Sequence, residues 1–165
     1  MNEKVESVIA LASLFFIGTS IIVGVNGLSQ QITWSYKFDR EIGDLFELAD
    51  RASDASTKYN YLKQFGEALE KNGLTEGQSA LYWPRPTSDL AHNYNASKSL
   101  LLRLEYLSKL DPKSFEYQTG MQQITLQEFC WFPIDIFRNG YLLKNGVWHL
   151  SVVPVDVENR CAERR

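Results

Sequence analysis

The sequence lacks the residue patterns on which most recognisable catalytic and cofactor sites depend. It has two cysteines, two histidines and five prolines in 165 residues. Two cysteines are too few for a small fold held together by a disulfide framework. No phosphate-binding P-loop, no dinucleotide-binding glycine pattern and no G-x-S-x-G elbow occurs, so nucleotide-dependent and serine-hydrolase chemistry find no support. We therefore expect a protein that is not an enzyme and carries no cofactor.

Metal and nucleic-acid sites are supported just as poorly. His92, His149, Cys130 and Cys161 show none of the short spacings that zinc sites use. We expect no metal site, with His92 on a helix surface and His149 on the polar side of a strand. The 17 Lys and Arg residues against 20 Asp and Glu give a net charge of −3. No basic patch stands out, so we expect no nucleic-acid partner.

One long stretch has no charge at all. No Asp, Glu, Lys or Arg lies between Ser7 and Tyr36. Residues 8–25 are apolar or small almost throughout, and as a helix they rise roughly 27 Å. Extension to Leu28 brings this length close to the ~30 Å of a bilayer core. The sequence predicts a single transmembrane helix that contacts the lipid bilayer through residues 8–28.

Two alternatives to this anchor stay open. Lys4 and Val25-Asn26-Gly27 resemble the basic start and the cleavage site of a signal peptide, but the apolar run is longer than such peptides use. A buried core helix would need cover on every side, for which the rest of the chain scarcely suffices. Trp34 and Tyr36 stand where an interfacial aromatic belt is expected. The flanking cations are nearly balanced, and the short N-terminal tail favours a domain outside the cytoplasm.

The rest of the chain shows helical spacing. From Trp34 to Leu69 apolar residues recur every three or four positions. Opposite charges four residues apart, as in Asp54–Lys58, are expected on the outer face. Asn72-Gly73 supplies a left-handed C-cap. The pattern predicts a first long helix that continues from the anchor to Asn72, with a close approach or a bend at the small residues 52–57.

Two more helices are predicted after a loop over residues 74–87. The second helix shows apolar residues from Leu90 to Leu107, with Thr87 or Ser88 as its N-cap. The third helix is expected to begin at Asp111-Pro112, because Asp is a good N-cap and Pro suits the first helical position.

The C-terminal part is ambiguous. Pro133 can begin a short helix that ends at Asn145-Gly146. Alternatively, the two Asn-Gly pairs in residues 133–146 are hairpin turns between short strands. Residues 147–153 alternate between apolar and polar side chains and are predicted to be extended.

These elements define the expected fold and its parts. The fold is mainly α, with an N-terminal transmembrane helix, an antiparallel helical bundle of about three long helices and a short C-terminal extended or β-hairpin segment. Residues 1–33 form the tail and the anchor, residues 34–157 form the bundle with its extended segment, and residues 158–165 form a polar tail.

Two features of the bundle are candidate sites. Cys130 and Cys161 would form one disulfide if the domain lies in an oxidising compartment, while a free, buried Cys130 is the alternative. Trp83 and Arg85 lie in an aromatic, proline-rich loop. They are candidates for a partner surface, since Trp and Arg dominate interface hot spots. The alternative is that the loop plugs one end of the bundle.

The sequence as a whole indicates a role in structure or interaction. We expect a single-pass, membrane-anchored helical-bundle protein that assembles with itself or with another membrane protein. The alternative is an extracytoplasmic module that senses a small ligand between its helices.

Overall fold

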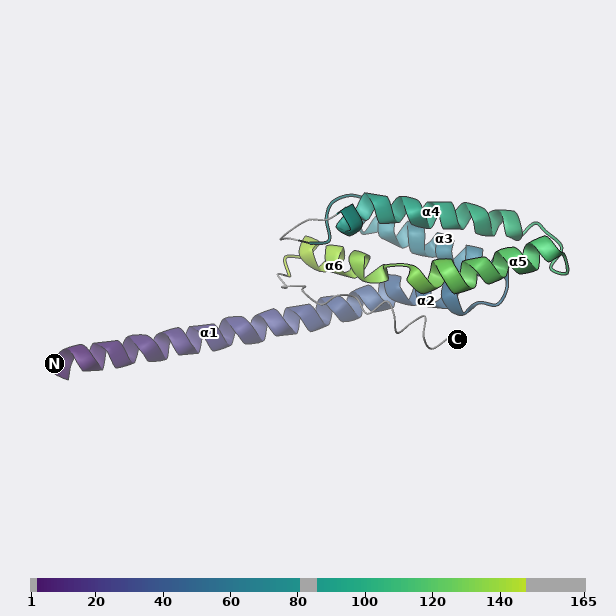
Figure 1. Cartoon of the computed structure of the whole chain (residues 1–165). Helices are drawn as coiled ribbons and strands as arrows, with labels where there is room; N and C mark the ends of the chain where they lie inside the picture. The colour runs from purple at the N-terminus through teal and green to yellow at the C-terminus, as the bar shows by residue number, and fades with distance from the viewer. Residues whose placement is uncertain (1–2, 81–85, 148–165) are drawn as a thin grey trace.

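α1 is the longest helix of the structure and projects away from all the others (Figure 1). A computed structural model of the chain describes residues 3–80 and 86–147. In chain order its helices are α1 (Glu3–Phe38), the π-helix η1 (Asp39–Gly43), α2 (Asp44–Arg51), α3 (Ala55–Lys71), the 3-10 helix η2 (Pro86–Ser88), α4 (Leu90–Leu107), α5 (Phe115–Gln123), the π-helix η3 (Ile124–Phe129) and α6 (Ile134–Lys144). Among the described residues, β-structure is limited to one isolated bridge between Gln78 and Asp89. The prediction of a mainly α protein with a long apolar N-terminal helix is confirmed.

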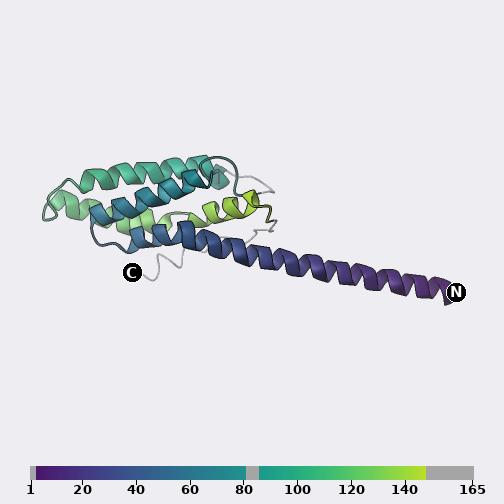
Figure 2. The same cartoon turned by 180° about the vertical axis from the view of Figure 1, so that it is seen from behind.

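The apolar helix runs directly into the first helix of the remaining chain, as predicted. Phe38 and Gly43, which flank η1, both keep right-handed helical backbone angles. The rod formed by α1, η1 and α2 is therefore continuous up to Arg51. Its last part joins the group of helices that we call the helical domain, residues 34–147 (Figures 1 and 2).

The prediction that this first helix continues to Asn72 is wrong. Ala52 is extended (φ −61°, ψ 141°), and a new helix, α3, begins at Ala55. The carboxylate of Asp54 accepts a hydrogen bond of 2.8 Å from the backbone N–H of Thr57. That bond caps a new N-terminus and competes with helix propagation through the same residues. The break falls within the small residues where a bend was expected.

α3, α4 and α5 run in alternating directions. Glu70, at the end of α3, accepts a hydrogen bond from Tyr94, near the start of α4. Tyr106, at the end of α4, donates a hydrogen bond of 2.7 Å to Glu116, at the start of α5. Figures 1 and 2 both show α3 and α4 side by side. We call the end that holds the α2–α3 and α4–α5 connections the distal end, because it lies farthest from the N-terminus of α1.

An aromatic cluster forms the centre of the core. Five phenylalanines are buried here: Phe46 of α2, Phe65 of α3, Phe129 of η3, Phe132 in the connection before α6, and Phe137 of α6. Ring centroids lie 4.7 Å apart for Phe46 and Phe132, and 5.9 Å apart for Phe65 and Phe137. Such contacts add about 0.5–1.5 kcal/mol per pair beyond the burial of apolar area. The cluster ties together helices that are far apart in the sequence.

The third predicted helix begins later than expected. α5 starts at Phe115, and the Ser114 hydroxyl accepts the N-capping hydrogen bond from Tyr117 (3.2 Å). Asp111 is instead used in a turn, where its carboxylate accepts a hydrogen bond of 2.9 Å from the backbone of Lys113. α4 is likewise capped by Asp89 and not by Thr87 or Ser88.

The ambiguity over residues 133–146 is decided in favour of a helix. α6 begins immediately after Pro133 and ends at Asn145-Gly146, where Gly146 has a positive φ of 73°. The alternative prediction of a hairpin turn at Asn139-Gly140 is wrong, since both residues lie inside α6. The extended segment predicted for residues 147–153, apart from Val147, and the polar tail 158–165 lie outside the described residues.

Candidate functional site

Most of the residues singled out from the sequence lie outside the described part of the chain. This holds for Trp83, Arg85, Cys161 and His149. Cys130, directly after η3, is buried. The partner surface around Trp83 and Arg85 and the bond between Cys130 and Cys161 therefore stay predictions.

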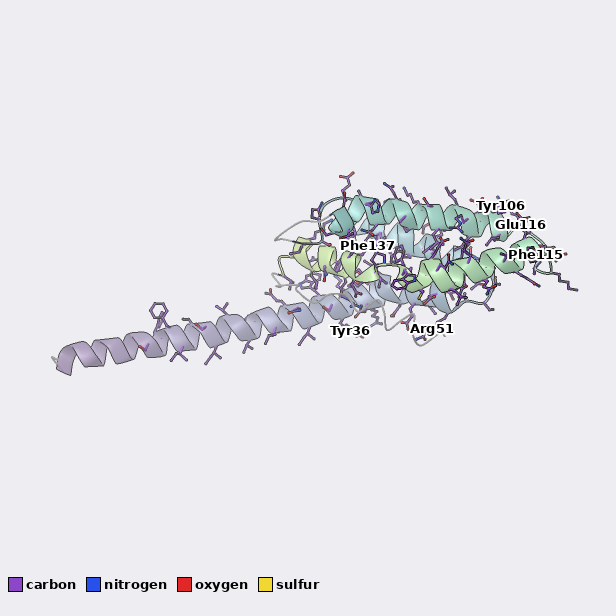
Figure 3. All side chains as sticks on the ribbon, viewed as in Figure 1. Tyr36, Arg51, Tyr106, Phe115, Glu116 and Phe137 are labelled. Carbon is purple, nitrogen blue, oxygen red and sulfur yellow. The ribbon has the colours of Figure 1, made fainter. Side chains whose placement is uncertain are left out.

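The first candidate surface is the apolar surface of α1. From Phe15 to Ile32 the large apolar side chains are each 57–71% exposed: Phe15, Phe16, Ile17, Ile21, Ile22, Val23, Val25, Leu28 and Ile32. Figure 3 shows side chains pointing away from this helix on both sides, with no neighbouring element to cover them. Among the described residues, one helix, Phe15–Arg51, is long and apolar enough to cross a membrane.

Four hydroxyl groups on α1, those of Thr19, Ser20, Ser29 and Thr33, donate hydrogen bonds to carbonyl groups of the helix itself. Thr19 Oγ1 donates to the carbonyl oxygens of Phe15 and Phe16, both at 3.0 Å, and Ser20 Oγ donates to Phe16 at 2.7 Å. Thr33 Oγ1 donates to a carbonyl one turn earlier at 2.8 Å. In the core of a bilayer no water is present to accept these bonds, so back-bonding removes the cost of unsatisfied donors. These four hydroxyl groups are thus compatible with an apolar solvent.

The helical domain begins to cover α1 near the end of the uncharged run. The ring of Trp34 lies 5.9 Å from that of Tyr141 on α6, and Phe38 lies 5.7 Å from the same ring. Lys37 Nζ lies 4.9 Å from the centre of the Trp34 ring. Burial, together with the nearby Glu41 carboxylate, raises the pKa of Tyr141. An aromatic and cationic girdle of this kind is typical of the membrane–water interface.

An ionic network fastens α6 to the rod just beyond this girdle. Arg138 on α6 donates to Asp39 of η1 through Nη2 (2.6 Å) and Nε (3.2 Å). It also donates to Asp135 at 2.8 Å. The two carboxylates hold the guanidinium group 5.8 Å from the Phe38 ring. This network joins α6 to the rod.

The second candidate surface is a groove between α4 and α5, which we call the distal groove. Its volume is about 400 Å³, and its floor is formed by Leu107, Gly120 and Ile124. A Cβ on Gly120 would lie only 2.7 Å from Leu107 Cδ2, so the two helices approach closely at this point. Tyr106 and Phe115 form the walls, and both are exposed.

Polar groups line the rim of the distal groove. Arg103 pairs with Glu128, and the Thr119 side chain is exposed. The hydrogen bond from the Tyr106 hydroxyl to the Glu116 carboxylate raises the pKa of Tyr106. Figure 3 shows Tyr106, Phe115 and Glu116 close together at the distal end. The groove offers an apolar pocket with charges of both signs and no paired nucleophile and base.

Known proteins give no further guide to this surface. No family model, no curated protein and no solved structure matches the chain. Within residues 3–80 and 86–147, no group of three or more His, Cys, Asp or Glu side chains is placed to hold a metal ion. His92 is exposed on α4, as predicted.

One buried cation was missed by the analysis of the sequence. Lys58 was predicted on the outer face beside Asp54, but it is only 1% exposed. Its Nζ donates to the carbonyl oxygens of Ala49 (3.0 Å) and Asp50 (2.7 Å), and it lies 4.5 Å from the centre of the Phe129 ring. The reversal of the chain between α2 and α3 turns Lys58 inward, and no local sequence signal marks that reversal strongly.

Proposed function

We propose that this chain is a single-pass membrane-anchored protein with a structural or protein-interaction role and no catalytic activity. One observation carries the proposal. From Phe15 to Ile32, α1 exposes apolar side chains on all sides, and the helical domain covers the rod only from Trp34 onward. In water such a surface would be strongly unfavourable, at about 25 cal/mol for each Å² of apolar area. A lipid bilayer removes that cost.

The helical domain would be an antiparallel bundle that sits directly on the bilayer surface. Support comes from the alternating helix directions and from the aromatic core that the helices share. The side chains of Trp34 and Lys37 would lie at the level of the lipid headgroups.

The domain would lie outside the cytoplasm. A disulfide between Cys130 and Cys161 would be consistent with an oxidising compartment. A reporter enzyme that folds only in such a compartment, fused to the C-terminus, tests the orientation. Activity of this reporter is the expected result. If only a reporter that works in the cytoplasm is active, the domain lies in the cytoplasm and the proposed orientation is wrong.

Carbonate extraction tests the anchor itself. The wild-type protein should stay with the membrane pellet at high pH, since its anchor is held by apolar contact with lipid. The variant Ile21→Lys with Val25→Lys should be released, because a charge near the middle of a membrane helix costs about 2.5–3.5 kcal/mol.

A matched pair of lysines provides the control. Leu48→Lys with Leu126→Lys alters exposed leucines of the helical domain and should leave the pellet fraction unchanged. Recovery of wild-type protein in the soluble fraction, with a new N-terminus close to Gly27, would show a cleaved signal peptide instead.

A small-ligand sensor is the second candidate. The distal groove favours it, because about 400 Å³ lies within the range of small-molecule sites. A rise in melting temperature with a small molecule, abolished by Thr119→Trp in the groove, would support this role. Loss of the membrane anchor would not affect that result, so the two candidates are separable.

A further inference from the structure

One amide side chain on α1 has no partner within its helix. Asn26 is exposed, and in the part of the chain that the structure describes its side-chain amide makes no hydrogen bond. Three other asparagines behave differently. The amides of Asn72, Asn93 and Asn145 each donate to the carbonyl oxygen four residues earlier, at 2.7–2.8 Å. The amide of Asn26 therefore needs a partner outside its own helix.

The depth of Asn26 in the membrane makes this need acute. With Trp34 at the level of the headgroups, Asn26 lies eight residues deeper, which is about 12 Å of helix. The headgroup layer on one side of a bilayer is only about 5–8 Å thick. Gln30 and Gln31, the other two amides of the uncharged run, lie within about 6 Å of Trp34 and reach that layer. Of these three amides, only that of Asn26 would meet hydrocarbon, where an unpaired polar group is costly.

The residues around Asn26 follow a seven-residue repeat along one face of α1. Thr19 and Thr33 stand seven positions before and after it. Seven residues are close to two helical turns, so the three side chains share a face. Ile22 and Ser29 stand three positions after Thr19 and Asn26 and flank the same line. This spacing is typical of the contact line between two helices that coil around each other. We call these five residues the polar seam.

The helical domain leaves the polar seam uncovered. Thr33 is exposed, whereas its neighbour Trp34 packs against Tyr141 on α6. Tyr36, which continues the seam three residues after Thr33, is 65% exposed. Figures 1 and 2 show α3 to α6 on one side of the rod formed by α1, η1 and α2. A second helix can therefore lie along the seam without displacing these helices.

We propose that the polar seam pairs with the seam of a second copy of this chain, with the two Asn26 amides hydrogen-bonded to each other in the membrane. This inference rests on the proposed membrane anchor and names the partner of that anchor. Apolar side chains elsewhere on α1 gain little from leaving lipid for another helix, because lipid tails are equally apolar. The amide supplies the gain that lipid cannot.

The membrane favours a second copy over an unrelated helix. All copies of a single-pass protein cross the bilayer in the same direction, so Asn26 of each copy lies at the same depth. A two-fold axis along the membrane normal places each seam residue opposite its counterpart. An amide has both donors and an acceptor, so two Asn26 side chains satisfy each other. A single Asn in such a contact line also selects a parallel pair in one register. An unrelated helix would need a polar group at this one depth.

Photocrosslinking of the full-length protein in native membranes tests which face pairs. A benzophenone amino acid at Ile22, on the seam, should give a product with twice the mass of the chain. The same probe at Leu28 should not, because Leu28 follows Asn26 by two residues and points to the other side of α1. Both side chains are 62% exposed, so the two probe positions are matched in exposure.

Substitution of Asn26 tests the amide itself. Asn26→Leu should weaken the pair about 3- to 30-fold, the range measured for hydrogen bonds between membrane helices. Asn26→Gln keeps an amide and should retain the pair. Gln31→Leu removes an amide from another side of α1 and should leave pairing unchanged. Energy transfer between labelled copies, followed at increasing dilution in lipid vesicles, measures each affinity. Leucine is more apolar than either amide, so both leucine variants should stay in the membrane.

Several results would overturn the inference. A crosslink from Ile22 to a different protein would refute self-association. Absence of a pair in the wild type, equal yields from Ile22 and Leu28, or equal pairing of wild type and Asn26→Leu would refute the polar seam. Recovery of the wild-type protein in the soluble fraction would instead refute the proposed function, so the two failures are distinguishable.

Discussion

At the scale of single residues, Lys58 stabilises the connection between α2 and α3. The last carbonyl groups of a helix have no partner within the helix, and a cation beside them is favourable. Lys58 reaches two of these carbonyls, those of Ala49 and Asp50, from the first turn of α3. Its third side is covered by Phe129. The two carbonyl oxygens and the aromatic ring thus offset the cost of burying the charged ammonium group.

Lys58→Met should destabilise the domain by about 1–3 kcal/mol. Methionine fills a similar volume but leaves buried carbonyl oxygens without a donor, and that loss has about this cost. Lys63→Met, an exposed position on the same helix, should change stability by less than about 0.5 kcal/mol. Urea unfolding followed by far-UV circular dichroism measures both. Equal stabilities of the two variants would contradict the role of Lys58.

Gly73 has the positive φ of 61° that a left-handed C-cap requires. Gly73→Ala should cost about 1 kcal/mol, because a Cβ is strained in this conformation and would contact Lys144 Nζ. Gly73→Val should cost at least as much. Gly66→Ala, in the open interior of α3, should stabilise the domain by about 0.5–1 kcal/mol instead. Thermal unfolding measures the change in melting temperature of each variant. If all three changes had the same sign, the left-handed cap at Gly73 would be unimportant.

At the scale of the elements, two π-helical segments adjust which residues face the core. Phe38, Ile42 and Phe46 are spaced four apart and are all buried. In a regular α-helix such a row drifts around the axis, since each turn takes 3.6 residues. The wider turn of η1, with its i→i+5 hydrogen bonds, keeps the row on one side. η1 therefore allows the last part of the rod to serve as a core helix.

The N-cap of α3, Asp54, makes the stability of this helix depend on pH. The backbone hydrogen bond from Thr57 lowers the pKa of Asp54 in the folded protein. Its contribution to stability is therefore present above the pKa of the unfolded chain, about 3.9, and is lost as the pH falls through the lower folded value. Asp54→Ala should cost about 1 kcal/mol near pH 7.

The difference between wild type and Asp54→Ala should shrink as the pH falls below about 4. Chemical unfolding at a series of pH values measures it. A difference that stays constant down to pH 2 would show that the charge of Asp54 does not contribute. Asp44→Ala is a suitable control, because Asp44 lies in the first turn of α2, where the helix is continuous with η1 and needs no cap.

At the scale of the whole molecule, the two parts of the rod have different surroundings. Its first part exposes apolar side chains, and its last part supplies Phe38, Ile42 and Phe46 to the core of the domain. The boundary lies at Trp34, which contacts Tyr141. Removal of the anchor should thus be tolerated only if the cut leaves this boundary intact.

A fragment of residues 34–165 should be soluble and mostly helical by far-UV circular dichroism. A fragment of residues 45–165 should not fold, because it lacks Phe38 and Ile42. Loss of two such side chains costs about 5–10 kcal/mol, which is comparable to the whole stability of a domain of this size. A folded 45–165 fragment, or a β-rich spectrum of the longer one, would contradict this account of the fold.

Several features were determined by the sequence alone, because they depend on local physics. The uncharged run from Ser7 to Tyr36 is sufficient to specify a long apolar helix, whatever surrounds it. The spacing of apolar residues is sufficient for α3 and α4. Gly73 marks the end of α3 because only a left-handed residue fits the C-cap there.

Tertiary structure alone decided the reversal at Ala52, the burial of Lys58 and the distal groove. Each depends on which helices become neighbours after folding. The spacing of apolar residues from Trp34 to Leu69 fits one continuous helix as well as two helices joined by a reversal of the chain. Lys58 is buried only because the reversal places the end of α2 beside it. The distal groove lies where Gly120 lets α5 approach α4 closely at Leu107. Contacts of this kind are set by the packing of distant segments, which no local pattern encodes.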